Sequence, residues 1–269
     1  MDATSPFLER YGPYIDGDLR GGVDDIAVRD PATNEQVTVV ADSGEERVDE
    51  AIKSCEAARD DWEGLDGVER GRVLSAIAAA LRDDQERFAR IETLENGRPI
   101  SASRKRVETA ARYFEYYAGL ADKVEGKSIP VDGGRLDYTV QEPYGVTAQV
   151  IPWNSSLLLG ARGLAPSLAV GNTIVAKVDP QTPASVIEFA RLASEAGLPD
   201  GVLNVVTGHG SDIGDAVASH PESDVVAFTG STDVGRRVAA AAGENLAEAA
   251  MELGGNNAHV VTADADIEQ

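Results

Sequence analysis

The sequence predicts an α/β fold in which a parallel sheet carries helices on both faces. After Gly145, short apolar runs alternate with segments of helical length, a pattern typical of a parallel sheet covered on both sides. Before residue 123, long segments place apolar residues at helical spacing. Between these two regions, residues 124–143 change to two extended runs around a glycine turn, which predicts a protruding β-hairpin arm.

The first elements are two short strands, at residues 14–17 and 26–28, followed by a turn at Asp30–Asn34, where Asp-Pro and Thr-Asn pairs break the chain. Ser43–Glu46 has the pattern of a capping box and predicts the start of a helix. The apolar residues that follow at helical spacing are Val48, Ala51, Ile52, Cys55, Ala58 and Trp62.

Two more helices are expected before the arm. One runs from about Val68 to Leu94 and one starts near Ser101, with Asn96–Pro99 between them. The residues expected to face the core are Leu74, Ile77, Leu81, Phe88 and Ile91 in the first helix, and Val107, Ala111, Phe114 and Tyr117 in the second.

The arm consists of Ile129–Val131 and Leu136–Val140 around Asp132–Gly134. A two-stranded hairpin is marginally stable by itself, so we expect it to pack on another subunit. We therefore assign residues 1–123 and 144–269 to one domain and residues 124–143 to the arm.

The βα alternation gives the remaining elements. Predicted strands are 146–151, 173–178, 202–206, 224–228 and 257–261, and predicted helices are 157–169, one from near Pro183 to before Gly197, one after Gly210 and one after Ser231.

The 269 residues include 46 acidic and 24 basic side chains, for a formal net charge of −22. This balance disfavours nucleic-acid and acidic-membrane partners, because phosphate binding needs clustered positive charge. The acidic N-terminus lacks the features of a secretory signal, so we expect a cytoplasmic location. Molar salt screens such self-repulsion, which favours a salt-rich, halophilic cytoplasm over an ordinary acidic protein as our hypothesis.

Cysteine and histidine usage argues against a metal site. Cys55 is the one cysteine, and it falls on the apolar face of a helix, as a buried structural cysteine does. The three histidines, His209, His220 and His259, have no metal-ligand spacing.

Four notable motifs follow strand ends. Ile151–Asn154, Lys177, Gly208–Gly210 and Phe228–Ser231 close the first four strands of the alternation. Ligands of such sheets bind at the carboxyl ends of the strands, so the motifs predict a site at this edge.

Two of these motifs suit an anionic ligand. Gly230 and Ser231 enter a helix, where free backbone N–H groups favour a phosphate, although such turns also cap ordinary helices. Lys177 follows a buried strand, and it either extends to solvent or donates to ribose hydroxyls or phosphate.

Asn154 and Glu252 each allow a structural and a catalytic interpretation. Asn154 either bonds nearby backbone in its turn or donates its amide to an oxyanion. Glu252 either ends a strand and bonds to backbone amides or, in a low-dielectric cleft, serves as a general base.

Together the four segments Ile151–Asn154, Lys177, Phe228–Ser231 and Glu252–Gly255 closely resemble the aldehyde dehydrogenase superfamily, and segments 92–99 and 181–183 are also similar to it. The resemblance implies a Rossmann-like sheet. It implies that Asn154 is the oxyanion donor, that Glu252 is the general base, and that residues 124–143 form the arm of a homo-oligomer. The implied cofactor-site residues are Ile151 and Trp153 along the cleft, Lys177 at the adenosine ribose, Gly210 near the adenine, and Gly230 and Ser231 at the pyrophosphate.

The implied reaction is NAD(P)-dependent oxidation of an aldehyde to a carboxylic acid. A thiolate adds to the aldehyde, hydride passes to the nicotinamide, and water activated by Glu252 releases the acid. Members that prefer NAD often place a glutamate three residues after the lysine. Here that position is Pro180 and a carboxylate stands at Asp179, so NAD and NADP both remain open, with a lean towards NAD.

The family's nucleophilic cysteine lies beyond the Glu-Leu-Gly-Gly segment, and no cysteine follows Glu252 in this sequence. We therefore expect a cofactor-binding half that lacks the catalytic domain and is inactive alone. The alternative is a non-catalytic module for nucleotide binding or subunit assembly.

Overall fold

The computed structural model describes residues 5–255 and 257–266, and its central feature is a seven-stranded sheet. Five parallel strands are β8 (Val146–Val150), β9 (Thr173–Lys177), β10 (Leu203–Val206), β11 (Val225–Gly230) and β12 (Glu248–Leu253). The N-terminal strands β2 (Tyr14–Ile15) and β3 (Asp18–Leu19) extend the β10 edge in antiparallel orientation, giving the order β12-β11-β8-β9-β10-β2-β3. The predicted parallel sheet is confirmed, and the two antiparallel strands are an addition to it.

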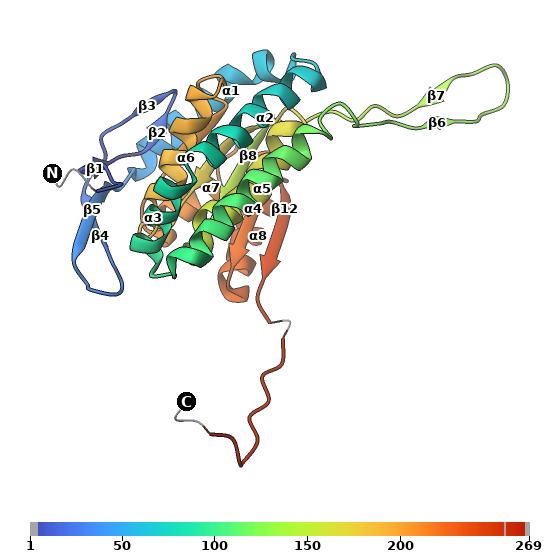
Figure 1. Ribbon diagram of the computed structural model, residues 1–269. Coiled ribbons are helices and arrows are strands. Elements are labelled where there is room, and N and C mark those ends of the chain that lie inside the picture. The colour runs from blue at the N-terminus through green and yellow to red at the C-terminus, as the bar shows by residue number, and fades with distance from the viewer. Residues whose placement is uncertain (1–4, 256, 267–269) are drawn as a thin grey trace.

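Helices cover both faces of the sheet, as predicted (Figure 1). On one face lie α1 (Gly44–Glu63), α7 (Asp215–Ala218) and α8 (Thr232–Glu244). On the other lie α5 (Ser156–Ala169) and α6 (Ala184–Glu195), with α2 (Gly67–Asp83), α3 (Gln85–Asn96) and α4 (Ile100–Ala118) packed over them as a further layer. Strand β9 shows why two cores form: Ile174 and Ala176 point to the α5–α6 side, whereas Val175 points to the α1 side.

A smaller three-stranded sheet lies near the N-terminus. Its strands are β1 (Arg10–Tyr11), β5 (Gln36–Ala41) and β4 (Asp25–Arg29), in that order. The turn predicted between β4 and β5 is present, and the backbone N–H of Asn34 donates to the carbonyl of Asp30 at 2.7 Å.

The helix predicted from Val68 to Leu94 is wrong in one respect, because it is two helices. Asp84, with φ −103° and ψ 18°, leaves the helical conformation between α2 and α3. Its carboxylate accepts from Arg87 Nε at 2.6 Å. The apolar periodicity hides this break because both helices bury their apolar faces in the same core.

The capping box predicted at Ser43 does not form. Ser43 is itself helical and makes no side-chain cap, because its hydroxyl oxygen accepts the backbone N–H of Thr207 at 2.8 Å. A capping box forms instead at α2, where Asp66 and Glu69 each accept the other's backbone N–H.

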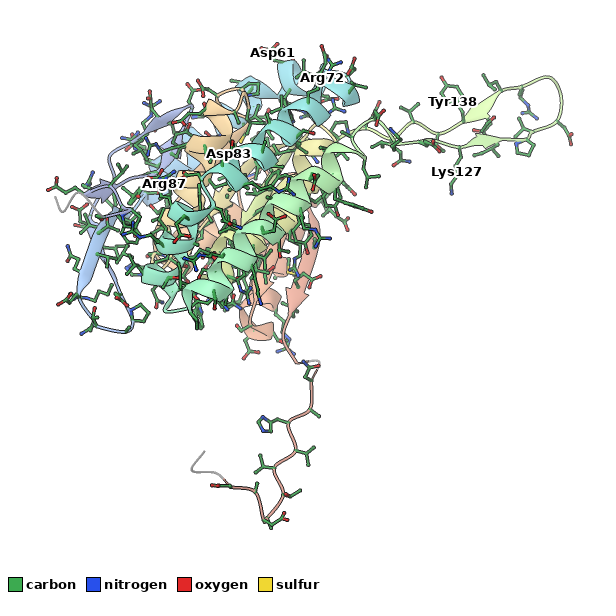
Figure 2. All side chains as sticks on the ribbon, viewed as in Figure 1. Asp61, Arg72, Asp83, Arg87, Lys127 and Tyr138 are labelled. Atoms are coloured by element: carbon green, nitrogen blue, oxygen red, sulfur yellow. The ribbon has the colours of Figure 1, made fainter. Side chains whose placement is uncertain are left out.

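The arm protrudes far from the body, as predicted (Figure 1). Its paired segments are shorter than expected: β6 (Ser128–Ile129) and β7 (Asp137–Tyr138) form one antiparallel ladder. Figure 2 shows Lys127 and Tyr138 on the two sides of this arm, away from the rest of the chain. Packing against another subunit stays a prediction.

The strand predicted at residues 257–261 is wrong. The last strand of the sheet is β12, which pairs along its whole length with β11, from Val225 beside Glu248 to Gly230 beside Leu253. Residues 257–261 are exposed and have no strand conformation. The apolar residues at 257–261 suggested a strand, but β12 occupies the place beside β11 where the chain would have added it.

No helix in the described part of the chain is long and apolar enough to span a membrane.

Candidate functional site

A cleft of about 390 Å³ opens where the parallel strands end. It lies beyond the carboxyl ends of β8, β9 and β11, and next to the loop after β10. All six residues that the sequence analysis assigned to a ligand cleft line it: Ile151, Trp153, Lys177, Gly210, Gly230 and Ser231. Their convergence follows from the parallel topology, which brings these strand ends to one edge.

The turn after β8 forms one wall of the cleft. It contains a short 3₁₀ helix, η1 (Trp153–Ser155). Ile151, which precedes this helix, is buried, whereas Trp153 is exposed. Asn96 Nδ2 donates to the Trp153 carbonyl at 2.7 Å. Arg98 donates to the Asn154 carbonyl. The backbone of the turn is therefore held by the end of α3 and the residues after it.

Lys177 ends β9 with only 4% of its surface exposed. The interpretation in which its ammonium group extends into solvent is therefore wrong. Burial lowers the pKa of Lys177, and the nearby carboxylates of Asp179 and Asp42 oppose that shift. The cleft thus holds one desolvated cation with carboxylates beside it.

Helix α8 points its N-terminus into the cleft. Ser231 is the N-cap residue, and its hydroxyl oxygen accepts the backbone N–H of Val234 at 3.4 Å. The remaining free N–H groups of the first turn and the helix dipole favour an anion at this position. Packing also favours glycine at position 230, because a Cβ there would lie 2.4 Å from the Phe228 ring.

The loop after β10 continues into a π-helical turn, η2 (Gly210–Gly214), and then α7. Gly210 and Gly214 line the cleft, and beyond them Asp215 pairs with Arg237 of α8 at 2.6 Å. Sequence reasoning missed this pair at the rim. A charged residue on a helix surface carries no pattern of its own, and only the contact between α7 and α8 identifies the pair.

A second cavity of about 280 Å³ adjoins the first. The two share the wall residues Val150, Ile151, Pro152, Phe228 and Thr229. Glu252, from β12, lines only the second cavity. The site is therefore elongated across the ends of β8 and β11.

Glu252 does not have the low-dielectric surroundings that the general-base argument assumed. Its side chain is 68% exposed and lies 3.7 Å from the Arg162 guanidinium. Arg162 also donates to the Thr229 hydroxyl at 3.3 Å, so it links β11 to β12. Sequence reasoning missed Arg162, which lies on α5 and also lines the second cavity.

Asn154 lines neither cavity as far as the described residues define them. Its side chain is exposed, one residue beyond Trp153. Of the four residues expected to meet around one ligand, Lys177 and Ser231 line the first cleft and Glu252 lines the adjoining cavity. The roles expected of Asn154 and Glu252 stay predictions.

The prediction of a buried structural cysteine is confirmed. Cys55 is fully buried in α1, and burial raises the pKa of its thiol to about 12. Asn204 Nδ2 lies 3.2 Å from Cys55 Sγ. Within residues 5–255 and 257–266, no group of three or more His, Cys, Asp or Glu side chains is arranged to hold a metal.

Comparisons with known proteins agree with this architecture. Residues 20–269 match the profile of the aldehyde dehydrogenase family. The chain is 42% identical over 266 residues to hydroxyisobutyraldehyde dehydrogenase of Mycolicibacterium austroafricanum, covering 99% of this chain and 52% of that protein. It is 44% identical over 243 residues to human mitochondrial aldehyde dehydrogenase, covering 88% and 47%.

Among solved structures, the chain is similar to the NAD⁺ complex of an aldehyde dehydrogenase from Bacillus cereus. The TM-score is 0.91 at 34% identity, over 97% of this chain and 54% of that one. The chain thus spans about half the length of the relatives it matches. The sequence motifs, the sheet topology and these matches agree: this chain belongs to the aldehyde dehydrogenase family.

Proposed function

We propose that this chain is the cofactor-binding half of an NAD(P)-dependent aldehyde dehydrogenase, which oxidises an aldehyde to a carboxylic acid. One observation carries the proposal: a buried lysine and a capped helix N-terminus line one cleft, which continues into the cavity that holds Glu252. The similar enzyme from Bacillus cereus was solved with NAD⁺, which supports a dinucleotide as the ligand.

The residues present fit such a ligand. The pyrophosphate would lie at the N-terminus of α8, where Ser231 and Gly230 present backbone N–H groups and the helix dipole. Lys177 would donate to the adenosine ribose, and Ile151, Trp153 and Gly210 would line the same cleft. An extended dinucleotide would use both cavities and so reach from Lys177 towards Glu252.

NAD is the better fit of the two cofactors. The carboxylates of Asp179 and Asp42 face Lys177, so the positive charge that a 2′-phosphate would need is already balanced. Asp179 also lines the cleft and would accept from a ribose hydroxyl.

The catalytic roles follow from chemistry on this chain. When bound, NAD(P) accepts a hydride from the substrate. Glu252 would take a proton from water, and the ion pair with Arg162 would hold the Glu252 carboxylate in place. Asn154 would offer its exposed amide to an oxyanion from a turn whose backbone is fixed. Cys55 is buried in α1 with a raised thiol pKa, so it supplies no thiolate and we propose that this chain alone oxidises no aldehyde.

Titration with NADH, followed by its fluorescence, tests the proposal. The chain should bind NADH more tightly than NADPH and should produce no NADH from NAD and an aldehyde. Replacing the buried cation by Lys177→Ala should weaken NADH binding about tenfold or more, because a charge-assisted hydrogen bond is lost.

Lys53→Ala is the matched control, because Lys53 is exposed on α1 and pairs only with Asp49 in the described contacts. Failure of the unmodified chain to bind either nucleotide would contradict the proposal. So would equal effects of the two substitutions.

The arm supports the second candidate, a subunit-assembly module. Exposed apolar side chains lie along it, namely Ile129, Val131, Leu136, Tyr138 and Val140. Light scattering on the chain with and without residues 126–141 distinguishes the two: assembly with no nucleotide binding favours the module.

A further inference from the structure

Helix α3 carries two buried carboxylates that the proposed chemistry does not use. Glu92 and Glu95 are 3% and 4% exposed, and their carboxylates contact the starts of α5 and α6. An ionised carboxylate in an apolar interior is costly unless hydrogen bonds hold it. Their partners are therefore informative.

Those partners are backbone N–H groups at the starts of two other helices. Glu92 Oε1 accepts from Leu157, the second residue of α5, at 3.3 Å. Glu95 accepts from Ala184 and Ser185, the first two residues of α6, at 2.9 and 3.3 Å. Neither helix has a side-chain cap of its own at its N-cap residue. Helix α3 thus caps α5 and α6 from outside.

Both capped ends directly follow the loops that shape the cleft. The turn before α5 contains Ile151 and Trp153, and the loop before α6 follows Lys177 and contains Asp179. Side chains also join the two loops. Thr182 donates its hydroxyl to the Trp153 carbonyl at 3.2 Å and lies 2.6 Å from the Ser156 hydroxyl.

We propose that Glu92 and Glu95 are positioning residues for the cofactor cleft. By capping α5 and α6, they hold the turn before α5 and the loop before α6 in fixed positions relative to each other. This inference rests on the proposed function, since it concerns the same cleft. It gives a role to two residues of segment 92–99, which resembles the aldehyde dehydrogenase family.

The charge on Glu95 should govern this hold. An ionised carboxylate accepts a hydrogen bond from each of the two N–H groups of α6. Protonation of the carboxylate weakens these hydrogen bonds. Burial and the neighbouring charge of Glu92 raise the pKa of Glu95 to about 8. Tyr11 lies close enough to Glu95 to interact with its charge, and Arg98 and Arg106 interact with the charge of Glu92. NADH affinity should therefore fall as the pH drops below about 8.

The test compares Glu95→Gln and Glu92→Gln with Glu86→Gln. Glu86 lies on the same helix but is exposed and pairs with Arg104, so it controls for loss of charge on α3. At pH 8.5, E95Q should bind NADH about tenfold more weakly, because two charged hydrogen bonds are lost, and E92Q less so. The pH dependence should disappear in E95Q and persist in E86Q.

Hydrogen exchange followed by mass spectrometry gives a readout that needs no nucleotide. Compared with E86Q, the peptide covering 151–158 should exchange faster in E92Q and the peptide covering 180–187 should exchange faster in E95Q, with the rest of the chain unchanged. Unaltered exchange in these two peptides would overturn the inference, even if the chain binds no NADH at all. Normal NADH affinity and pH profile in a less thermostable E95Q would also overturn it and leave a purely structural role.

If E95Q does not fold, E92Q decides the matter, because it removes only the contact with Leu157. Absence of NADH binding by the unmodified chain would count against the proposed function and not against the capping of the two helices.

Discussion

At the scale of single residues, Glu95 links the fold to pH. Burial raises its pKa in the folded chain to about 8, from the ordinary value of 4.5. The folded chain therefore binds this proton more tightly than the unfolded chain does. The associated stability is fully present below about pH 4.5 and is lost as the pH rises through about 8.

We predict a measurable consequence in urea unfolding at pH 6 and pH 9. Because one proton is released over this range, the free energy of unfolding of the unmodified chain should fall more than that of E95Q, by up to about 3 kcal/mol. Equal falls in the two proteins would show that Glu95 does not titrate in this window.

The sequence was sufficient to predict the cleft residues that end strands, and insufficient for side-chain surroundings. Lys177 and Ser231 were found because a parallel sheet brings strand ends together. The exposure of Glu252 depends on which neighbours cover β12, and motif spacing carries no information on that. The same reason explains why Arg162 was missed, since only the contact across β11 and β12 gives it a place in the site.

At the scale of elements, apolar periodicity predicted where helices lie better than where they end. It located the buried faces of α1 to α4, because burial repeats every turn. It did not detect the break at Asp84, which depends on one residue's backbone angles. It also assigned a capping box to Ser43, although the hydroxyl of that residue bonds to Thr207 across the chain.

The packing of α2 on α4 gives a prediction at this scale. Gly71 of α2 lies so close to α4 that an added Cβ would be 2.6 Å from the Ala118 carbonyl oxygen. Gly71→Ala should therefore destabilise the chain by about 1–3 kcal/mol through overpacking. Thermal unfolding followed by circular dichroism measures the change.

Gly243→Ala is the matched control, because Gly243 is also helical, in α8, and no atom lies within 4 Å of a Cβ built there. This change should stabilise the chain by about 0.5–1 kcal/mol, since alanine loses less backbone entropy than glycine in a helix. If both substitutions had the same sign, the close approach of α2 to α4 would be refuted.

At the scale of the whole molecule, the formal charge of −22 affects stability through self-repulsion. The Debye length shortens from about 10 Å at 0.1 M salt to about 3 Å at 1 M, so repulsion between surface carboxylates is largely screened in concentrated salt. We expect the urea midpoint to rise between dilute buffer and 1 M KCl. Equal folding in both buffers would remove the case for a salt-rich cytoplasm.

The addition of β2 and β3 to the β10 edge of the sheet has a consequence for biosynthesis. Strand β2, which contains Tyr14, finds its partner in β10, at Val205, and Tyr11 donates its hydroxyl to Glu188 of α6. On the ribosome, Tyr11 and β2 therefore emerge long before α6 and β10, and these contacts must wait for most of the chain to be translated. Nascent chains shorter than about two hundred residues would carry an unattached N-terminal segment, open to chaperones and to proteases.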